Sequence, residues 1–156
     1  FETLLSQKKD SEVVQYELAT TLSSTVAFGF DPMLRSVRAD QLSTKLLSNA
    51  PDLPRYQALK AHTLLTLASH QSRAGRLRIA EENLMQALQY YDSLISETPE
   101  LRVYETRRLQ TLETIADVKL RRRDTEAAAD FLAVLIGIGV AVAGCRPLEE
   151  QEFVEH

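Results

Sequence analysis

The sequence predicts an all-α protein built from antiparallel helical hairpins, and three observations lead to this prediction. Glycine and proline number only five each in 156 residues, so there are few turn residues for a sheet of many short strands. A proline followed five residues later by tyrosine occurs at Pro51 to Tyr56 and again at Pro99 to Tyr104, and Pro147 follows after the same interval. We call this interval, from position 51 to position 99, the long period; a fixed period of this size is typical of stacked structural repeats. Composition agrees, because 44% hydrophobic and 26% charged residues are globular values.

The first predicted hairpin covers residues 10–50, after residues 1–9 that resemble the end of a preceding helix. Asp10 or Ser11 suits an N-cap, and a helix is expected from there to Gly29. A second helix is expected from Pro32 to Asn49, because Asp31 supplies a capping carboxylate and proline fits the first helical position. The apolar residues expected to face inward are Val14, Leu18, Leu22 and Val26 in the first helix and Leu34, Val37, Leu42 and Leu46 in the second.

Two further hairpins are predicted over residues 51–98 and 99–146. The first pairs a helix from Pro54 or Arg55 to Arg73 with one from Arg76 to Thr98, joined at Ala74–Gly75. The second pairs residues 101–122 with residues 125–143, joined near Arg123–Asp124. An acidic tail, residues 147–156, is expected to follow.

Small and large side chains recur inside these two hairpins at a known spacing. The residues that have this spacing are Leu64, Leu67, Ala68, Ala80, Leu84 and Ala87, and the same spacing recurs at Leu112, Ile115, Ala116, Ala128, Leu132 and Leu135. In this respect the chain resembles the tetratricopeptide repeat (TPR) family. The resemblance implies one TPR-like domain over residues 1–156, folded as a right-handed α-solenoid, in which residues 10–50 form a degenerate repeat.

The long period departs from the family, since 48 residues exceed the TPR period of about 34. Each helix gains about seven residues, and a seven-residue insertion turns the packing face by only about 20°. Arrays of such long helices look like repeat regions of large bacterial regulatory proteins.

The resemblance also implies a function. In TPR proteins the first helix of each pair lines a concave groove that binds a peptide or a partner protein. The positions that correspond to groove contacts are His62, Leu65, Ser69, Ser72, Gln110, Glu113, Asp117 and Leu120. The alternative is a solvated helix face with no ligand.

Arginine is concentrated at two turns that lie one long period apart. The expected basic edge consists of Arg73, Arg76, Arg78, Arg121, Arg122 and Arg123. Cations suit helix C-termini, so a solvated edge is the favoured interpretation, with binding of phosphate or an acidic partner as the alternative.

A run of fifteen uncharged residues, Phe131 to Cys145, begins within the last predicted helix and extends just beyond it. A membrane span needs about 20 apolar residues, so this run is too short to cross a bilayer. A terminal repeat usually has a polar outer face, and this one does not. We therefore expect a further repeat or a second copy of the chain to cover it, in a possible homodimer. The residues expected to self-associate are Phe131, Leu135, Ile136, Ile138, Val140 and Val142.

The remaining chemistry is sparse. His62 and His70 lie within 100° of each other on one helix without a carboxylate or thiol set, and Cys145 is alone, so neither a metal site nor a cofactor is expected. No nucleophile with a base stands out, so no catalysis is expected. A net charge of −4 disfavours nucleic-acid binding.

The chain starts at Phe1 without a leader, which suggests an excised segment. The sequence does not indicate the cellular compartment, and the cytoplasm is the default assignment. The sequence thus favours a protein-interaction scaffold, with an oligomerising segment of a larger regulatory protein as the alternative.

Overall fold

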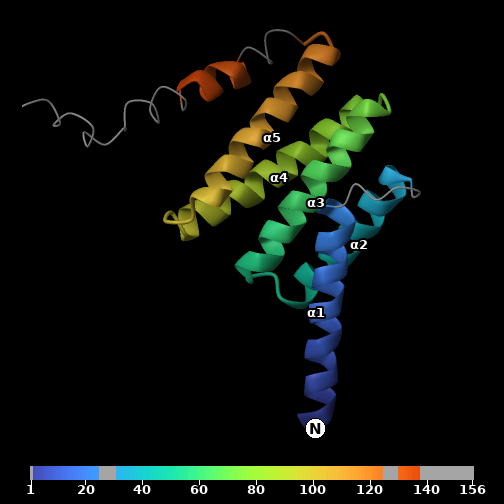
Figure 1. The fold of residues 1–156 in the computed structure, drawn as a ribbon. Helices are drawn as coiled ribbons and strands as arrows, with labels where there is room; N and C mark the ends of the chain where they lie inside the picture. The colour runs from blue at the N-terminus through green and yellow to red at the C-terminus, as the bar shows by residue number, and fades with distance from the viewer. Residues whose placement is uncertain (1, 25–30, 125–129, 138–156) are drawn as a thin grey trace, which may run out of the picture.

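A computed structural model describes residues 2–24, 31–124 and 130–137, and these residues form helices joined by short turns, with no strand (Figure 1). The prediction of an all-α protein is therefore confirmed. Residues 130–137 are helical as well. The five long helices are α1 Glu2–Ser24, α2 Pro32–Asn49, α3 Pro54–Arg73, α4 Leu77–Glu97 and α5 Arg102–Arg121.

The ends of α2 to α5 lie within one residue of the predicted ends. Proline begins two of these helices. At α2, Asp31 Oδ1 accepts a hydrogen bond of 2.9 Å from the Met33 amide, and Pro32 occupies the first turn. At α3, Pro54 stands at the start without a side-chain cap. Proline is compatible with this position because the first N–H groups of a helix have no intrahelical acceptor.

The predicted helix boundary at Asp10 or Ser11 is wrong, because α1 is one helix from Glu2 to Ser24. Asp10 and Ser11 could cap a helix, but a cap forms only where the preceding backbone leaves the helical conformation. No proline or glycine lies within α1 to force that departure. The predicted stretch beyond Ser24, including Val26, lies outside the described residues.

The long period of the sequence is also a period of the backbone hydrogen bonds. At the α3–α4 turn, the Gly75 amide donates to the Ser72 carbonyl at 3.0 Å, and the Arg76 amide donates to the Gln71 carbonyl at 2.9 Å. After α5, the same two bonds recur one long period later, from Arg123 to Leu120 and from Asp124 to Lys119, both at 2.9 Å. The two helices therefore end in the same way.

The turns that contain Pro51 and Pro99 repeat each other too. The Ala50 amide donates to Leu46 at 3.2 Å, and Thr98 donates to Leu94 at 2.9 Å. The amides of Tyr56 and Tyr104 likewise donate to Leu53 and Leu101. Positions one long period apart in this part of the chain are therefore structurally equivalent.

Contacts between the helices follow a simple order. Consecutive helices pack against each other from α1 to α5, and α3 also contacts α1 and α5. In contrast, α2 and α4 do not contact each other. The first helices of the successive pairs therefore form a connected layer, whereas the two second helices are separate (Figure 1).

Three hydrophobic clusters form the core, and α3 contributes to all of them. Leu65 and Ala68 pack with residues of α4 and α5 in one cluster. Tyr56 and Leu59 pack with α1 and α2 in the second, and Ala61 packs with α4 in the third.

The predicted inward faces of α1 and α2 are partly wrong. Leu42 and Leu46 are buried, but Val14 is 64% exposed, and Leu18, Leu34 and Val37 are exposed as well. The buried positions instead include small side chains, namely Ala19 in α1 and Ser36, Ala39 and Ser43 in α2. Small residues allow two helices to approach closely, and a pattern of large apolar residues alone does not reveal them.

Polar contacts join α2 to α3. The hydroxyls of Ser43 and Thr63 are buried and hydrogen bonded at 2.9 Å. Lys60 Nζ lies 2.5 Å from Asp40 Oδ1 and donates to Thr44 Oγ1 at 2.8 Å. These bonds satisfy polar groups that would otherwise be costly to bury.

Candidate functional site

The predicted groove residues of α3 divide into two groups. His62 and Ser69 are half-buried, so they remain partly accessible. Leu65 and Ser72 are buried, with 4% and 5% exposure, so neither is available to a partner. On α5, the corresponding residues Gln110, Glu113, Asp117 and Leu120 are all exposed.

The equivalence of positions one long period apart explains this division. Leu65 corresponds to Glu113, and Ser72 corresponds to Leu120. Leu65 packs in one cluster with Ile115 and Val118 of α5, so α5 covers this side of α3. No described element covers the same side of α5, which leaves Glu113 and Leu120 exposed.

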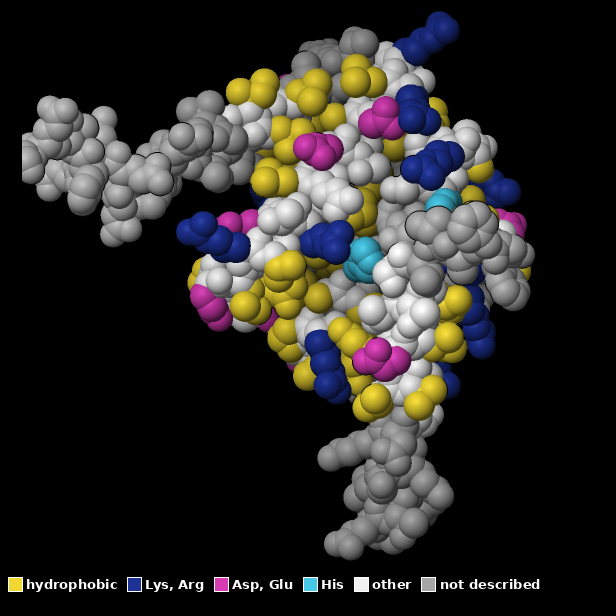
Figure 2. Space-filling view, in the orientation of Figure 1, with side chains coloured by type: hydrophobic (Ala, Val, Ile, Leu, Met, Phe, Trp, Pro, Cys, Tyr) yellow, Lys and Arg dark blue, Asp and Glu magenta, His cyan; other side chains and the backbone are white. Residues whose placement is uncertain are grey.

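The face of α3 is shown in Figure 2, where histidine side chains reach the surface; both histidines of the described residues belong to α3. Acidic, basic and apolar side chains are mixed across this face. Burial lowers the pKa of His62, and the nearby Arg107 charge lowers it further. His62 Nδ1 is enclosed without a hydrogen-bond partner. Burial and the Arg107 charge therefore both favour the neutral form of the His62 imidazole at the seam between α3 and α5.

Arg107 extends from α5 toward this seam. It is half-buried, and its Nη1 donates to Gln110 Oε1 at 3.0 Å. Behind it lies Tyr91 of α4, which is buried with Ala61 and packs near Tyr104. Burial raises the pKa of Tyr91 to about 12, although Arg107 acts in the opposite direction, and the Tyr91 hydroxyl has no hydrogen-bond partner. The sequence analysis named neither Arg107 nor Tyr91 as a functional residue.

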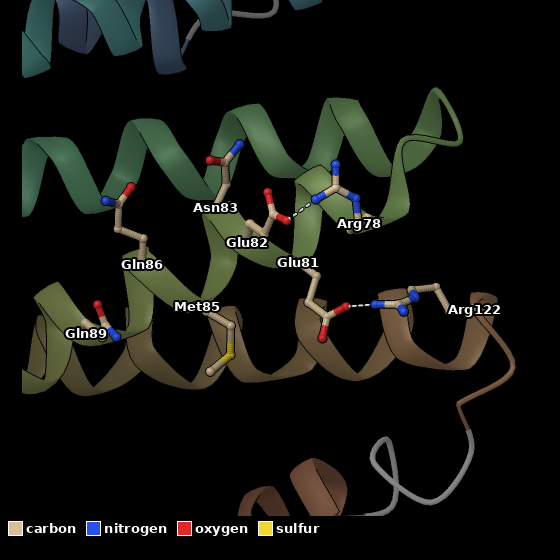
Figure 3. A pocket seen from close by; sticks show the side chains of 8 residues that line it. All are labelled: Arg78, Glu81, Glu82, Asn83, Met85, Gln86, Gln89 and Arg122. Atoms are coloured by element: carbon tan, nitrogen blue, oxygen red, sulfur yellow. Dashed lines mark hydrogen bonds and ion pairs between the residues drawn. The ribbon is translucent and has the colours of Figure 1, made fainter.

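A second surface feature is an open hollow of about 700 Å³ on the α4–α5 side (Figure 3). It is lined by Arg78, Glu81, Glu82, Asn83, Met85, Gln86, Gln89 and Arg122. The sequence analysis did not predict this hollow, because its residues come from the exposed side of α4 and the distant end of α5.

The charges that line the hollow are paired within the chain. Arg78 binds Glu82 at 2.5 Å, and Lys119 binds Glu81 at 2.6 Å. Arg122 also pairs with Glu81 (Figure 3). Hydrogen bonding from Lys119 is the largest cause that lowers the pKa of Glu81. No cation or acid of the hollow therefore lacks a counter-charge.

The predicted basic edge lies at one end of the molecule, where the α3–α4 turn and the end of α5 come near each other (Figure 1). Its residues are all exposed. Three of them have acidic partners: Arg78 and Arg122 as described, and Arg121, which binds Asp117 at 2.8 Å. Arg73, Arg76 and Arg123 make no ion pair with another described residue. Intramolecular pairing thus offsets part of the local positive charge.

The predicted self-association residues are only partly described. Phe131 packs against the cluster of α3, α4 and α5, and Lys119 Nζ lies 5.7 Å from the centre of its ring. Leu135 is half-buried, whereas Ile136 is 67% exposed. Ile138, Val140 and Val142 lie outside the described residues. Leu132 and Val134 add exposed apolar surface to this short helix.

Two further findings concern the described residues alone. They contain no group of three His, Cys, Asp or Glu side chains that could hold a metal ion. None of their helices combines the length and apolar character that a membrane crossing requires. Cys145 lies outside this part of the chain. Comparison with protein-family models, curated proteins and solved structures finds no match.

Proposed function

We propose that this chain is a protein-interaction scaffold without catalytic activity, built as a TPR-like, right-handed α-solenoid. In this proposal α1, α3 and α5 line a concave groove that holds an extended or helical peptide of a partner protein. The proposal follows the spacing of large and small residues in the sequence and the recurrence of the turns after one long period.

One observation carries the proposal. The first helices contact one another through α3, while α2 and α4 remain apart. A curved array has this pattern, because its inner layer is compressed and its outer layer is spread. The inner face then belongs to α1, α3 and α5, which is the arrangement that a peptide groove requires.

The accessible residues define the contact set. On α3 these are His62 and Ser69, and on α5 they are Gln110, Glu113 and Asp117, with Leu120 at the end of the same exposed face. Glu113 forms no ion pair with a described residue, so its carboxylate is free to bind a partner.

The test is a peptide-display selection on the whole chain, followed by affinity measurements with the selected peptides. We expect Glu113→Lys combined with Asp117→Lys to abolish binding while the helical circular dichroism signal is retained. Asp52→Lys combined with Glu100→Lys is the matched control, since it changes the net charge equally at exposed turn residues. Equal binding by both double variants would refute the groove assignment.

A specific observation also favours a second function, self-association of a segment of a larger regulatory protein. The short helix of residues 130–137 exposes Leu132, Val134 and Ile136. Exposed apolar surface of this kind commonly marks an interface. In sedimentation experiments a dimer that Ile136→Glu dissociates, and that Ile79→Glu on α4 leaves intact, would favour this alternative. A monomer at all concentrations would exclude it.

A further inference from the structure

Arg107 differs from three other cationic side chains that lie between helices, because those three each bind a carboxylate. Lys60 binds Asp40 at 2.5 Å, Arg108 binds Asp92 at 2.6 Å, and Lys119 binds Glu81 at 2.6 Å. Arg107 is also half-buried between helices, but its hydrogen-bond partner is the neutral amide of Gln110. No described carboxylate forms an ion pair with it.

The residue one long period before Arg107 shows which side chain the packing of the helices can accommodate at this position. Arg107 corresponds to Leu59, which is 5% exposed and packs with residues of α1 and α2. A leucine therefore fits this position in the first layer of helices. Placing a guanidinium there costs desolvation free energy, which an opposite charge normally offsets.

The surroundings of Arg107 add unused hydrogen-bonding capacity. His62 Nδ1 and the Tyr91 hydroxyl are both enclosed without partners. Arg107 acts electrostatically on both groups, and no carboxylate acts appreciably on either. The seam therefore has a positive charge and lacks an anion.

We propose that Arg107, with His62 beside it, forms a binding site for a single oxyanion, a carboxylate or a phosphate group carried by a ligand, at the seam between α3 and α5. The guanidinium fork matches either group with two parallel N–H donors. The bound oxyanion would then replace Gln110 Oε1 as the acceptor of the hydrogen bond from Arg107 Nη1. The site shares His62 with the proposed groove contacts, but its test does not depend on the peptide groove, because a free anion can occupy it.

The test uses His62 as a reporter, since an anion bound at Arg107 favours the imidazolium. The His62 and His70 resonances are followed by NMR against pH in acetate, inorganic phosphate or chloride at equal ionic strength. We expect acetate or phosphate to raise the His62 pKa saturably by about 0.5 pH units or more, with little change at His70. His70 serves as the internal control because its charged neighbours are Arg73, Arg35 and Asp31.

Two variants decide the assignment. Arg107→Gln is expected to remove the saturable shift, whereas Arg102→Gln, at an exposed arginine of the same helix, should preserve it. Arg107→Lys keeps the charge but loses the fork, so its affinity for the anion should fall about tenfold. A response to acetate alone identifies a carboxylate site, and a response to phosphate alone identifies a phosphate site. The proposal is overturned by the absence of a saturable shift in the natural chain, by its persistence in Arg107→Gln, or by unchanged affinity in Arg107→Lys.

Discussion

Gly75 and Arg123 lie one long period apart and hold the same left-handed backbone conformation after successive first helices, with φ of +77° and +63°. Each follows a helix whose last carbonyls accept the same pair of backbone hydrogen bonds. Glycine adopts this conformation without steric cost, whereas arginine does not. The fold therefore accepts strain at one of two equivalent turns.

This difference gives a first prediction about stability. Gly75→Ala should lower the free energy of unfolding by about 1 kcal/mol, because a Cβ is disfavoured at this φ. A Cβ there meets no atom within 4 Å, so the loss comes from the backbone alone. Arg123→Gly should instead raise it by up to about 0.5 kcal/mol, limited by the greater freedom of glycine in the unfolded chain. Urea denaturation measures both changes, and a stabilising Gly75→Ala would contradict the equivalence of the turns.

A second prediction compares Lys60 with its equivalent, Arg108. The Lys60 and Asp40 side chains are 9% and 24% exposed, whereas Arg108 and Asp92 are 29% and 50% exposed. Lys60→Ala should therefore lower the free energy of unfolding by about 2 kcal/mol, because it leaves the Asp40 carboxylate without its counter-ion and removes the packed aliphatic part of the lysine side chain. Arg108→Ala should lower it by less than about 1 kcal/mol. Thermal and urea unfolding of both variants check the order, and equal losses would show that burial does not govern these pairs.

A third prediction concerns acid stability and Glu81. Lys119 and Arg122 lower the pKa of Glu81 below its ordinary 4.5, so the folded state favours the carboxylate. The stabilisation that the Glu81 carboxylate gains from these two cations is fully present above the pKa of Glu81 in the unfolded chain, which is about 4.5. It is lost as pH falls through the lower pKa of Glu81 in the folded chain. The difference in unfolding free energy between the natural chain and Glu81→Gln should therefore be constant above about pH 5.5 and shrink at lower pH. Urea titrations at several pH values test this, and a difference that is independent of pH down to pH 3 would contradict it.

The histidines give a fourth prediction. Burial, followed by Arg107, lowers the pKa of His62 below 6.5, so the unfolded chain binds the proton more readily than the folded chain does. Stability is therefore fully retained above pH 6.5 and declines as pH falls toward the folded pKa of His62. His62→Gln should reduce the loss of stability between pH 8 and pH 5. Part of the loss should persist in this variant, because burial also lowers the pKa of His70. An identical loss in both proteins would show that His62 does not contribute.

The sequence predicted helix existence and helix ends well from Pro32 onward. The reason is local: Pro32, Pro54 and Gly75 act through their own backbone geometry, which needs no tertiary context. Asp10 failed as a boundary because capping is permitted, but not required, by its side chain.

The packing faces were harder to predict. Ser36 and Ser43 are buried because α2 approaches its neighbours closely, and a hydroxyl becomes favourable there only when a partner such as Thr63 is opposite. That partner lies twenty residues away in sequence. A count of apolar residues along one helix cannot reveal it.

The candidate sites show the same limit. The groove positions assigned through the TPR resemblance include Leu65, which α5 buries, and the assignment passed over Arg107, which has no acidic partner in the described chain. Both facts depend on how α5 lies against α3. The sequence alone offered one signal, since arginine replaces leucine at position 107 relative to position 59.

The participation of α3 in all three hydrophobic clusters has a consequence for how the molecule opens. Fraying from either end removes contacts from one flank and leaves the other flank of α3 intact. Amide hydrogens in the middle of α3 are therefore expected to be the last to exchange with solvent. The terminal helices should open before α3 does, so protection from exchange should fall from α3 towards both ends of the described chain.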